Sequence, residues 1–597
     1  MDELIRSGSY VALQLPSELL KVVEIQPNIT ISLGKFGAFQ TNNLIGRPFH
    51  VTYEIVDKPS RDGGSNLRPV PAAELHELGI GDTTTPDEAV IGNDGVDFEV
   101  VDTEGKVVMR TNQFINEDGA NQILTLEDIE ALKKADNSAG KDVIAKILES
   151  HTSLDKKTAF SLAKYTLRKS RKYMKRFTVL PIDVPVIVKW VMDGKDAPRI
   201  MEMREETLSL VTSWSNVHWG GAHGNESCNG LGQTDHNRWL VVDEISGLLV
   251  AAMAEQMGIL HSRPRDSMSL SEDVLRNVAA TEINGISESH EESGRTKESD
   301  PIRIQQARIH RQELFMSGTT NTITLVHQNA QPNLSLLTYF GYNTSDPDMN
   351  HPLYTNLKEI SFLQLLHPEE DYGYLEPAES TPEQLKEMKS RQKSAYYRKR
   401  RRWQRTKAIV EETRAGGFAG LAVASAMTPA SILHTLVPLL RGGAQIVVYS
   451  PTVEPLTEIV DCYSKARRSA FALAENPVVP CEEYPVDPRL LIGVSLHTAR
   501  SRPWQVLPGR THPKMSGRGG SEGYVFVGTK VYPAEGTIEA RGFRKRRKLD
   551  VSTNGTQHGS PALQSELPHT ESQSEVDMEV DKEVVSLIDN AQSTVGD

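Results

Sequence analysis

Hydrophobic and polar residues alternate along the first part of the chain in the pattern of β-strands. The strand-like segments, rich in β-branched and aromatic residues, are 9–16 (SYVALQLP), 30–39 (TISLGKFGAF) and 49–56 (FHVTYEIV). Several short strands in succession predict a small barrel or sandwich. We therefore predict an N-terminal β-barrel domain over residues 1–115. A mobile insertion is expected at 58–95, where Pro, Gly, Asp and Thr replace the alternation.

A helical period follows the predicted barrel. Thr125 is a good N-cap residue for the first of these helical segments. The segments with apolar residues at helical spacing are 126–134, 141–150 and 156–176. Pro181 and Pro185 then stop the pattern. The sequence thus predicts a short helical, basic linker region over 120–200.

From about residue 200, near-continuous apolar segments alternate with helical ones. The strand-like segments are 238–245 (RWLVVDEI), 322–329 (TITLVHQN), 421–426 (LAVASA), 444–451 (AQIVVYSP) and 523–531 (GYVFVGTKV). Strands that alternate with helices predict a parallel sheet covered by helices. We assign 201–535 to a Rossmann-like domain with polar insertions at 262–305 and 367–410. The polar, Gly-rich segment 512–520 (HPKMSGRGG) is predicted to be a loop between the last two strands.

The end of the chain has a different composition. The segment 545–597 is rich in Ser, Thr, Glu and Asp and poor in aromatic residues. Such a segment buries too little apolar surface to fold alone, so we expect a disordered acidic tail. The predicted fold class is α+β and multidomain: a barrel, a helical linker region, a Rossmann-like domain and a disordered tail.

The first strand of the Rossmann-like domain ends in a turn that lacks the features of a nucleotide-type cofactor site. Such a site has a Gly-rich turn after the first strand and an acidic residue, for the ribose hydroxyls, at the end of the second. Here the turn after Asp243 keeps only Gly247, and Gln328 stands where the carboxylate is expected. We interpret these residues as a degenerate cofactor site and predict no catalytic residue, cofactor or metal in this chain. The alternative is that these strands are unrelated, because a lone glycine is weak evidence.

The charge distribution points to a polyanionic partner. The 597 residues carry a net charge of −13, yet basic residues gather in three short stretches. Binding of a polyanion depends on the local field, so the acidic total does not exclude RNA. No apolar run reaches the roughly 20 residues that span a bilayer, and the first residues lack a signal-peptide pattern. The three cysteines have no metal-ligand spacing. We expect an intracellular protein of the cytosol or nucleus that does not associate with membranes.

The first basic stretch, 156–177, contains no acidic residue. Its cations recur three and four residues apart and therefore share a helix face. We predict phosphate binding by Lys164, Arg168, Arg171, Lys172 and Lys175. Lys35 and Arg47 from the predicted barrel are expected to contact RNA phosphates as well. The alternative is a solvated charged face.

The second basic stretch, 389–407, combines arginines with aromatic residues. A helix is expected to begin at Thr381 and Pro382 and to end at Gly416 and Gly417. Cations beside aromatic rings can combine electrostatic capture with base stacking. The predicted RNA-binding residues are Arg398, Arg400, Arg401, Arg402 and Arg405, beside Tyr396, Tyr397 and Trp403. The alternative is a solvated tether.

The third basic stretch borders the predicted tail. It consists of Arg544, Lys545, Arg546, Arg547 and Lys548. A run of this kind is typical of a nuclear import signal. A nonspecific RNA-binding arm is the alternative.

Four long segments resemble one protein family. They are SLGKFGAFQTNNLIGRPFHVTYEI (32–55), TAFSLAKYTLRKSRKYMKRFTVLP (158–181), SWSNVHWGG (213–221) and LVVDEISGLLVAAMAEQMG (240–258). The chain up to about residue 531, apart from the insertions, is similar to the non-catalytic subunit of the eukaryotic tRNA adenine-58 N1-methyltransferase. The resemblance implies an N-terminal β-barrel and a C-terminal methyltransferase-like domain.

The resemblance also implies partners. It implies assembly with a catalytic paralogue, which holds S-adenosylmethionine, into a heterotetramer of two pairs. It further implies tRNA binding by this chain, no catalytic residue of its own, and a nuclear location. Two other functions remain open: an RNA-binding scaffold in translation initiation, and an active S-adenosylmethionine-dependent methyltransferase with an unconventional donor site.

Overall fold

The computed structural model describes residues 4–56, 66–77, 99–101, 107–109, 122–135, 140–152, 159–194, 196–217, 237–261, 318–343, 350–507, 510–514 and 521–533. Met1–Pro533 is one compact unit, and Ala534–Asp597 is a second unit that lies outside the described residues. The predicted insertion at 262–305, the tail at 545–597 and the import stretch at 544–548 therefore lie outside the described residues and stay predictions.

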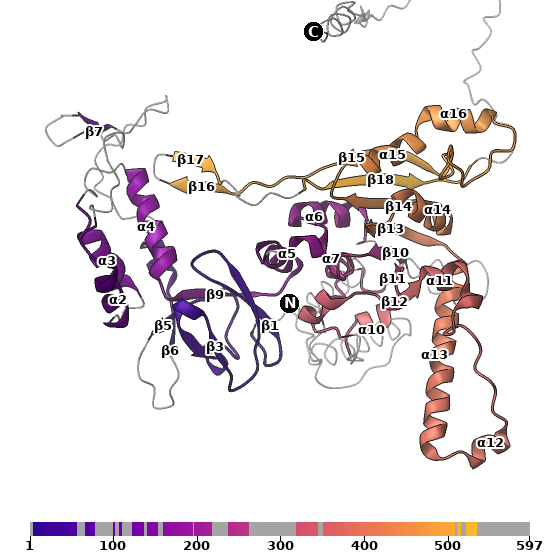
Figure 1. Cartoon of the computed structure of the whole chain (residues 1–597), viewed down its shortest axis with the longest axis horizontal. Coiled ribbons are helices and arrows are strands. Elements are labelled where there is room, and N and C mark those ends of the chain that lie inside the picture. The colour runs from indigo at the N-terminus through magenta and orange to yellow at the C-terminus, as the bar shows by residue number, and fades with distance from the viewer. Residues whose placement is uncertain are drawn as a thin grey trace, which may run out of the picture. The chain divides into compact units, whose positions relative to one another are not determined.

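Five strands of the N-terminal half form one antiparallel sheet in the order β2-β1-β9-β5-β6 (Figure 1). They are β1 (Tyr10–Gln14), β2 (Leu20–Glu24), β5 (Thr52–Val56), β6 (Asn66–Pro69) and β9 (Arg176–Pro181). The central strand β9 lies in the region that the sequence assigned to a helical linker. It belongs there because its buried residues Phe177 and Val179 alternate with partly exposed ones and complete the apolar core of this sheet.

A second hairpin packs on this sheet. It pairs β3 (Thr30–Ser32) with β4 (Ala38–Gln40), and the short 3₁₀ helices η1 (Gly34–Phe36) and η2 (Thr41–Asn43) adjoin it. Phe39 of β4 stacks on Phe177 of β9, with ring centroids 4.7 Å apart. Among the described strands, β2 and β6 each pair on one side only, so closure into a barrel stays a prediction.

Part of the segment predicted as a mobile insertion is folded, which corrects that prediction for residues 66–77. β6 and α1 (Ala72–Glu77) lie within it. β6 is the edge strand of the sheet, and ion pairs of Glu74 join α1 to it. Arg176 contacts Glu54 at 3.1 Å and Glu74 at 2.7 Å. Arg68 contacts the same two carboxylates, and hydrogen bonds from Arg68 and then Lys141 lower the pKa of Glu74 to about 2. A separate small hairpin pairs β7 (Glu99–Val101) with β8 (Val107–Met109).

Three helices follow, as predicted. They are α2 (Leu126–Ala135), α3 (Lys141–Glu149) and α4 (Ala159–Tyr173). Thr125 is the N-cap of α2: its hydroxyl accepts a hydrogen bond from Asp128 N at 3.2 Å, and the Asp128 carboxylate accepts one from Thr125 N at 3.1 Å. Tyr173 of α4 packs against Val143 and Ile147 of α3.

Pro181 and Pro185, both predicted to interrupt the helical pattern, have different places in the structure. Pro181 ends β9, but Pro185 lies in the first turn of helix α5 (Val184–Asp193). A helix tolerates proline there because the missing N–H has no intrahelical partner at that position. Asp183 caps this helix through a 2.7 Å hydrogen bond from Val186 N. The chain then continues through η5 (Ala197–Ile200) and α6 (Glu205–Trp214).

The C-terminal half is built on a seven-stranded sheet in the order β12-β11-β10-β13-β14-β18-β15. The strands are β10 (Arg238–Asp243), β11 (Thr322–His327), β12 (Leu357–Ser361), β13 (Phe418–Ala424), β14 (Leu440–Ser450), β15 (Leu491–His497) and β18 (Tyr524–Lys530). The first five are parallel, and all of them except β12 lie in the predicted strand segments. β18, which the sequence also assigned to the parallel series, runs antiparallel to its neighbours β14 and β15. Numbered along the chain, the order is 3-2-1-4-5-7-6, which reverses at the first strand as in Rossmann-like sheets.

Successive residues of the central strands point to opposite faces of the sheet, and each face has its own core. On β10, Trp239 and Val241 belong to one core, and Leu240 and Val242 belong to the other. The first core contains side chains of α5, α6 and α7 (Leu248–Met257). The second contains side chains of α14 (Pro429–Leu436), α15 (Glu454–Cys462) and the end of α13 (Ser390–Arg414). Burial on both faces explains why these strands are almost continuously apolar.

The remaining elements connect the strands. They are η7 (Ser335–Phe340), α10 (Leu353–Asn356), α11 (Phe362–Leu366), η8 (Pro368–Glu370), α12 (Pro382–Glu387), η9 (Val437–Leu439), α16 (Lys465–Leu473), and the hairpin of β16 (Trp504–Leu507) and β17 (Arg510–Pro513). The hairpin occupies part of the segment predicted as a loop between the last two strands. No helix among the described residues is long and apolar enough to cross a membrane.

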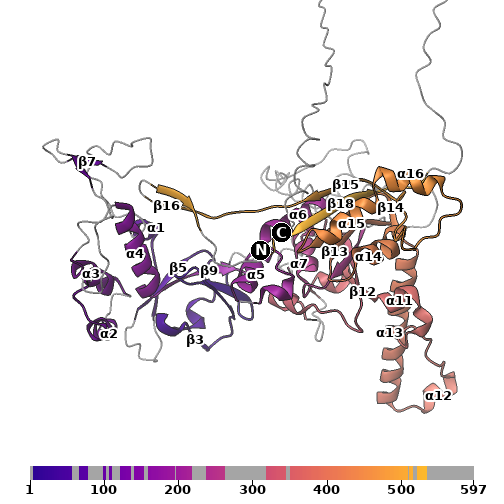
Figure 2. The same ribbon diagram turned by 45° about the horizontal axis from the view of Figure 1, so that its top comes forward.

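The insertion at 367–410 contains two helices instead of one. Thr381 caps α12 as predicted, but that helix ends at Glu387 and α13 begins at Ser390. Gly416 and Gly417, both with positive φ, follow the end of α13. Figures 1 and 2 show α13 extending away from the sheet, and only two of its residues, near its C-terminal end, are buried.

Candidate functional site

The predicted remnants of a donor site come together at the ends of three strands. β10 lies between β11 and β13, and the strand order reverses at this point. In an open α/β sheet, ligands bind in the crevice at such a reversal. Asp243 ends β10, Gly247 lies in the turn after it, and Gln328 follows β11. The crevice is therefore the place at which a methyl donor is expected.

Asp243 is a buried carboxylate that holds the turn after β10. Its Oδ1 accepts hydrogen bonds from the backbone N–H groups of Ile245 at 2.9 Å and Gly247 at 3.1 Å. Its Oδ2 accepts one from Val250 in α7 at 3.0 Å. Burial raises the pKa of Asp243 to about 6, although these hydrogen bonds oppose the shift. The carboxylate thus organises the chain's own backbone.

The backbone of the turn faces other residues of the chain. Ser246 and Gly247 both have positive φ, 65° and 86°. The carbonyl oxygen of Ser246 accepts a hydrogen bond from Leu336 N at 3.0 Å. A Cβ atom added to Gly247 would lie 3.1 Å from the Cα atom of Leu334. The start of η7 therefore lies directly on the turn, where a donor would need bare backbone.

Polar side chains fasten this arrangement. The Ser246 hydroxyl accepts hydrogen bonds from Arg199 Nε and Asn333 Nδ2, both at 3.2 Å. The Arg199 guanidinium also donates to the hydroxyl of Ser335 at 2.6 Å. A left-handed conformation costs a residue other than glycine about 1–3 kcal/mol, so it needs support from its surroundings. Arg199 and Asn333 supply that support to Ser246.

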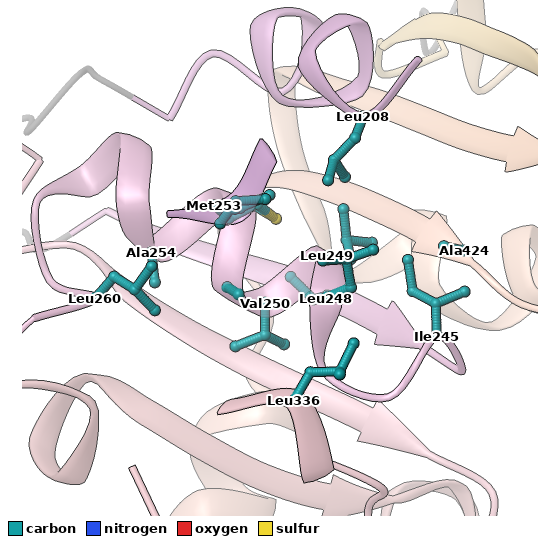
Figure 3. Packing of buried hydrophobic residues seen from close by; sticks show 14 of the residues in the cluster. Leu208, Ile245, Leu248, Leu249, Val250, Met253, Ala254, Leu260, Leu336 and Ala424 are labelled. Carbon is teal, nitrogen blue, oxygen red and sulfur yellow. The ribbon is translucent and has the colours of Figure 1, made fainter. Parts of the chain in front are cut away.

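The apolar side chains around the turn fill the space between the elements. Figure 3 shows Ile245, Leu248 and Leu249 packed with Leu336 and Ala424. All five are fully buried. An apolar interior of this kind is close-packed and leaves little room for a bound molecule.

Glu244, directly after β10, contacts the ends of the two neighbouring strands. Its Oε2 accepts hydrogen bonds from the hydroxyl of Ser425 at 2.7 Å and from Ala426 N at 2.8 Å, both after β13. Its Oε1 accepts one from the side chain of Gln328. One carboxylate thus joins the ends of β10, β11 and β13. The sequence interpretation missed Glu244, although a carboxylate directly after a buried strand was a usable signal.

These residues do not fit a nucleotide-type methyl donor. The turn is covered by residues 334–337, and the crevice beside it is bridged by Glu244. Gln328, at the position of the ribose-binding carboxylate, is itself bound to Glu244. The strand-end site has the architecture of a donor site, but its space and its hydrogen-bonding groups are used by the chain itself.

The first predicted basic cluster lies on and just after α4. Lys164, Arg168 and Lys172 are exposed and follow one another at four-residue spacing, so they form one stripe along the helix. The interleaved aromatic residues Tyr165 and Tyr173 are buried, each only 9% exposed. The charged stripe is therefore the surface of α4, whereas its tyrosines belong to the interior.

Two other cations of this cluster are placed differently. Lys175 is partly buried after the end of α4. Arg171 forms an ion pair with Glu18, in the turn between β1 and β2. The same carboxylate receives Lys514, which follows β17, at 3.0 Å. Glu18 and Arg171 also line a cavity of about 310 Å³ together with Arg176.

The second predicted cluster lies on α13. Arg398, Arg401, Arg402 and Arg405 are exposed. Arg400 is partly buried because it forms an ion pair with Glu379 at 2.7 Å. Most of this cationic surface is therefore open to solvent.

The aromatic residues of α13 have structural contacts. Trp403 Nε1 donates a hydrogen bond to the carbonyl oxygen of Tyr374 at 2.8 Å. The hydroxyl of Tyr396 accepts hydrogen bonds from Ser380 N at 3.4 Å and from Arg400 at 3.0 Å. These two rings hold the preceding segment against the helix. Tyr397 is 47% exposed and keeps an open face.

The two predicted residues of the N-terminal half are exposed on separate connections. Lys35 lies in η1, with its ammonium 4.8 Å from the ring centroid of Phe36. Arg47 follows η2, close to the start of β5.

Comparison with known proteins places the chain among relatives of similar length. The model of the Gcd10p family matches residues 4–389. A protein of Aspergillus fumigatus named tRNA (adenine(58)-N(1))-methyltransferase non-catalytic subunit trm6 is 44% identical, with 97% of this chain and 100% of that protein covered. The Aspergillus oryzae protein of the same name is 45% identical, with 93% of this chain and 97% of that protein covered.

The similarity to solved structures is much lower. A SAM-dependent O-methyltransferase from Thermotoga maritima shares 9% identity, with a TM-score of 0.36 and coverage of 89% of this chain and 97% of that one. The fold assignment therefore rests on the strand order described above.

Proposed function

We propose, because the chain belongs to the Gcd10p family, that it is the non-catalytic, tRNA-binding subunit of a tRNA adenine-58 N1-methyltransferase. The observation that carries this proposal is the filled crevice at the ends of β10, β11 and β13. Residues 334–337 lie on the turn over which a methyl donor would bind, and this supports a subunit without a donor of its own. We infer that a catalytic paralogue holds S-adenosylmethionine.

The contribution of this chain is then the binding of tRNA. The target adenine lies in the folded T-arm, and a base inside such a structure must be extruded at a cost of a few kcal/mol. Contacts to phosphates along the RNA offset that cost. The exposed stripe of Lys164, Arg168 and Lys172 on α4 and the arginines of α13 are the surfaces that we assign to these contacts.

The assembly and location follow from the same proposal. We propose a heterotetramer of two pairs, each pair combining this chain with the catalytic paralogue. The basic stretch 544–548 is proposed as a nuclear import signal. We also infer that the N-terminal sheet and the β3–β4 hairpin are parts of one barrel, since Ile31 and Phe39 share a core with Val11 and Ile55.

A methylation assay tests the main proposal. This chain and its catalytic paralogue are purified alone and together, and methyl transfer to tRNA is measured for each preparation. We expect activity only for the complex, and none with a tRNA in which adenine 58 is replaced. Methylation by this chain alone would refute the proposal, as would a paralogue that reaches full activity and full tRNA affinity without it.

Calorimetry separates the proposal from an active methyltransferase with an unconventional donor site. S-adenosylmethionine is titrated into the isolated chain and, as a positive control, into the complex. We expect heat of binding for the complex alone. Micromolar binding by the isolated chain would favour the active enzyme. A scaffold in translation initiation is distinguished by depletion, which then leaves N1-methyladenosine in tRNA unchanged.

A further inference from the structure

The β16–β17 hairpin is a basic ribbon that the proposed tRNA-binding surfaces do not include. It lies between β15 and β18 in the chain and forms a sheet of its own. The segment 498–521 contains no acidic residue. It carries Arg500, Arg502, Arg510, Lys514 and Arg518, of which Arg500 pairs with Glu522 and Lys514 with Glu18. A ribbon with this excess of positive charge is complementary to a polyanion.

The ribbon has one covered face and one open face. Trp504 and Val506 point to the same side of β16 and are 59% and 72% exposed. Their partners across the hairpin, Pro513 and Thr511, are also exposed. Gln505 and its partner His512, on the other side, are partly buried. The open face therefore presents an indole ring to solvent.

The hairpin joins the basic stripe of α4. Figures 1 and 2 both show β16 beside α4, and the two elements are in contact. Glu18 fixes the junction, because it pairs with Arg171 of α4 and with Lys514 after β17. The single carboxylate faces two cations, so the junction keeps a net positive charge.

We propose, resting on the function proposed above, that the open face of the β16–β17 hairpin binds an unpaired nucleotide of the tRNA. Trp504 stacks on the base, and Arg502 with the stripe of α4 contacts the neighbouring phosphates. An exposed indole beside cations is the combination by which proteins hold unpaired nucleotides. A polyanion suits this face better than a protein partner does, because the segment 498–521 has no acidic residue and Arg502 lies two residues before Trp504.

The test uses the assembled complex of the full chain with its catalytic paralogue. Affinity for tRNA is measured across a range of salt concentrations for Trp504→Ala, Trp504→Tyr and Arg502→Gln. Loss of a base stack weakens binding by about fivefold or more, without a change in salt dependence. We expect this for Trp504→Ala and near wild-type binding for Trp504→Tyr. Arg502→Gln should reduce the salt slope by about one.

Leu473→Ala is the matched control, because Leu473 is 85% exposed on α16 and lies outside this surface. It should leave tRNA affinity unchanged. Wild-type affinity in Trp504→Ala would overturn the proposal. So would loss of the paralogue from that variant on size-exclusion chromatography, since the hairpin would then be a protein interface. If the wild-type complex itself fails to bind and methylate tRNA, the proposed function fails instead.

Discussion

Asp243 gives a prediction that distinguishes a structural carboxylate from a donor-binding one. Its pKa of about 6 in the folded protein lies above the ordinary value of 3.8, because burial disfavours the charged form. Below both values the carboxyl is protonated in both states. As pH rises from about 4 to 6 the unfolded chain ionises first, so the folded state loses stability. The difference becomes constant about one pH unit above the pKa of the folded state, near pH 7.

The magnitude follows from the shift. About two pKa units correspond to about 3 kcal/mol, lost in full above about pH 7. Roughly half of it, about 1.4 kcal/mol or a tenfold change in local opening, falls between pH 5 and 7.5. Asp243→Asn removes the ionisation. It also places an amide NH₂ near the N–H of Val250, which costs about 1–3 kcal/mol at every pH.

Hydrogen exchange of peptides covering residues 244–252 measures this effect locally. After correction for intrinsic exchange rates, wild-type protection should fall about tenfold from pH 5 to 7.5, whereas Asp243→Asn should be less protected at both values and lack the pH difference. Peptides from β1, which pairs with β2 and β9, serve as the control. An equal pH dependence in the variant would refute the assignment of a raised pKa to this carboxyl.

Three further predictions concern the proposed surfaces and the core. Reversing the charges of Arg168 and Lys172 should weaken tRNA binding by the complex and flatten its salt dependence, and unchanged binding would remove α4 from the proposed surface. Neutralising Arg398, Arg401 and Arg402 with glutamine should lower the salt slope by up to about three, whereas an unchanged slope would leave α13 as a solvated helix. Gly140→Ala should lower the melting temperature. Gly140 has a φ of 97°, and an added Cβ would lie 2.3 Å from the carbonyl oxygen of Tyr173. A variant with the wild-type melting temperature would contradict this close approach of Gly140 and Tyr173.

The sequence predicts four of the five parallel strands because they are buried on both faces, whereas β12, which contains Lys358 and Glu359, was missed. A strand such as β10 is almost continuously apolar, and no helix boundary interrupts it. The strand β9 was missed for a physical reason. It follows the basic helix α4 directly, and its partners β1 and β5 are far away in the sequence. A short strand whose partners are distant has no local signal of its place in a sheet.

For the candidate site too, some features can be predicted from the sequence and others arise only from the fold. The loss of the Gly-rich turn and of the ribose carboxylate is visible in Gly247 and Gln328 themselves. The covering of the turn is not, because Arg199 and Leu334 come from other segments that only the fold brings together. Likewise, an aromatic residue among arginines looks the same in a sequence whether its ring is open, as in Tyr397, or anchors a neighbouring segment, as in Trp403.

The contacts at the strand ends satisfy the hydrogen-bonding groups of the turn from within the chain. A strand-end turn exposes backbone N–H groups toward the ligand, and buried groups without partners cost about 1–3 kcal/mol each. In this chain Asp243 accepts hydrogen bonds from two of the turn's N–H groups. The carbonyl oxygen of Ser246 accepts a hydrogen bond from Leu336 N, and Glu244 accepts one from Ser425 after the neighbouring strand β13. We therefore expect that glycines introduced into the turn would not produce donor binding, because residues 334–337 would still cover it. These residues are part of the chain, so they contact the turn without the translational entropy loss that a free ligand incurs on binding.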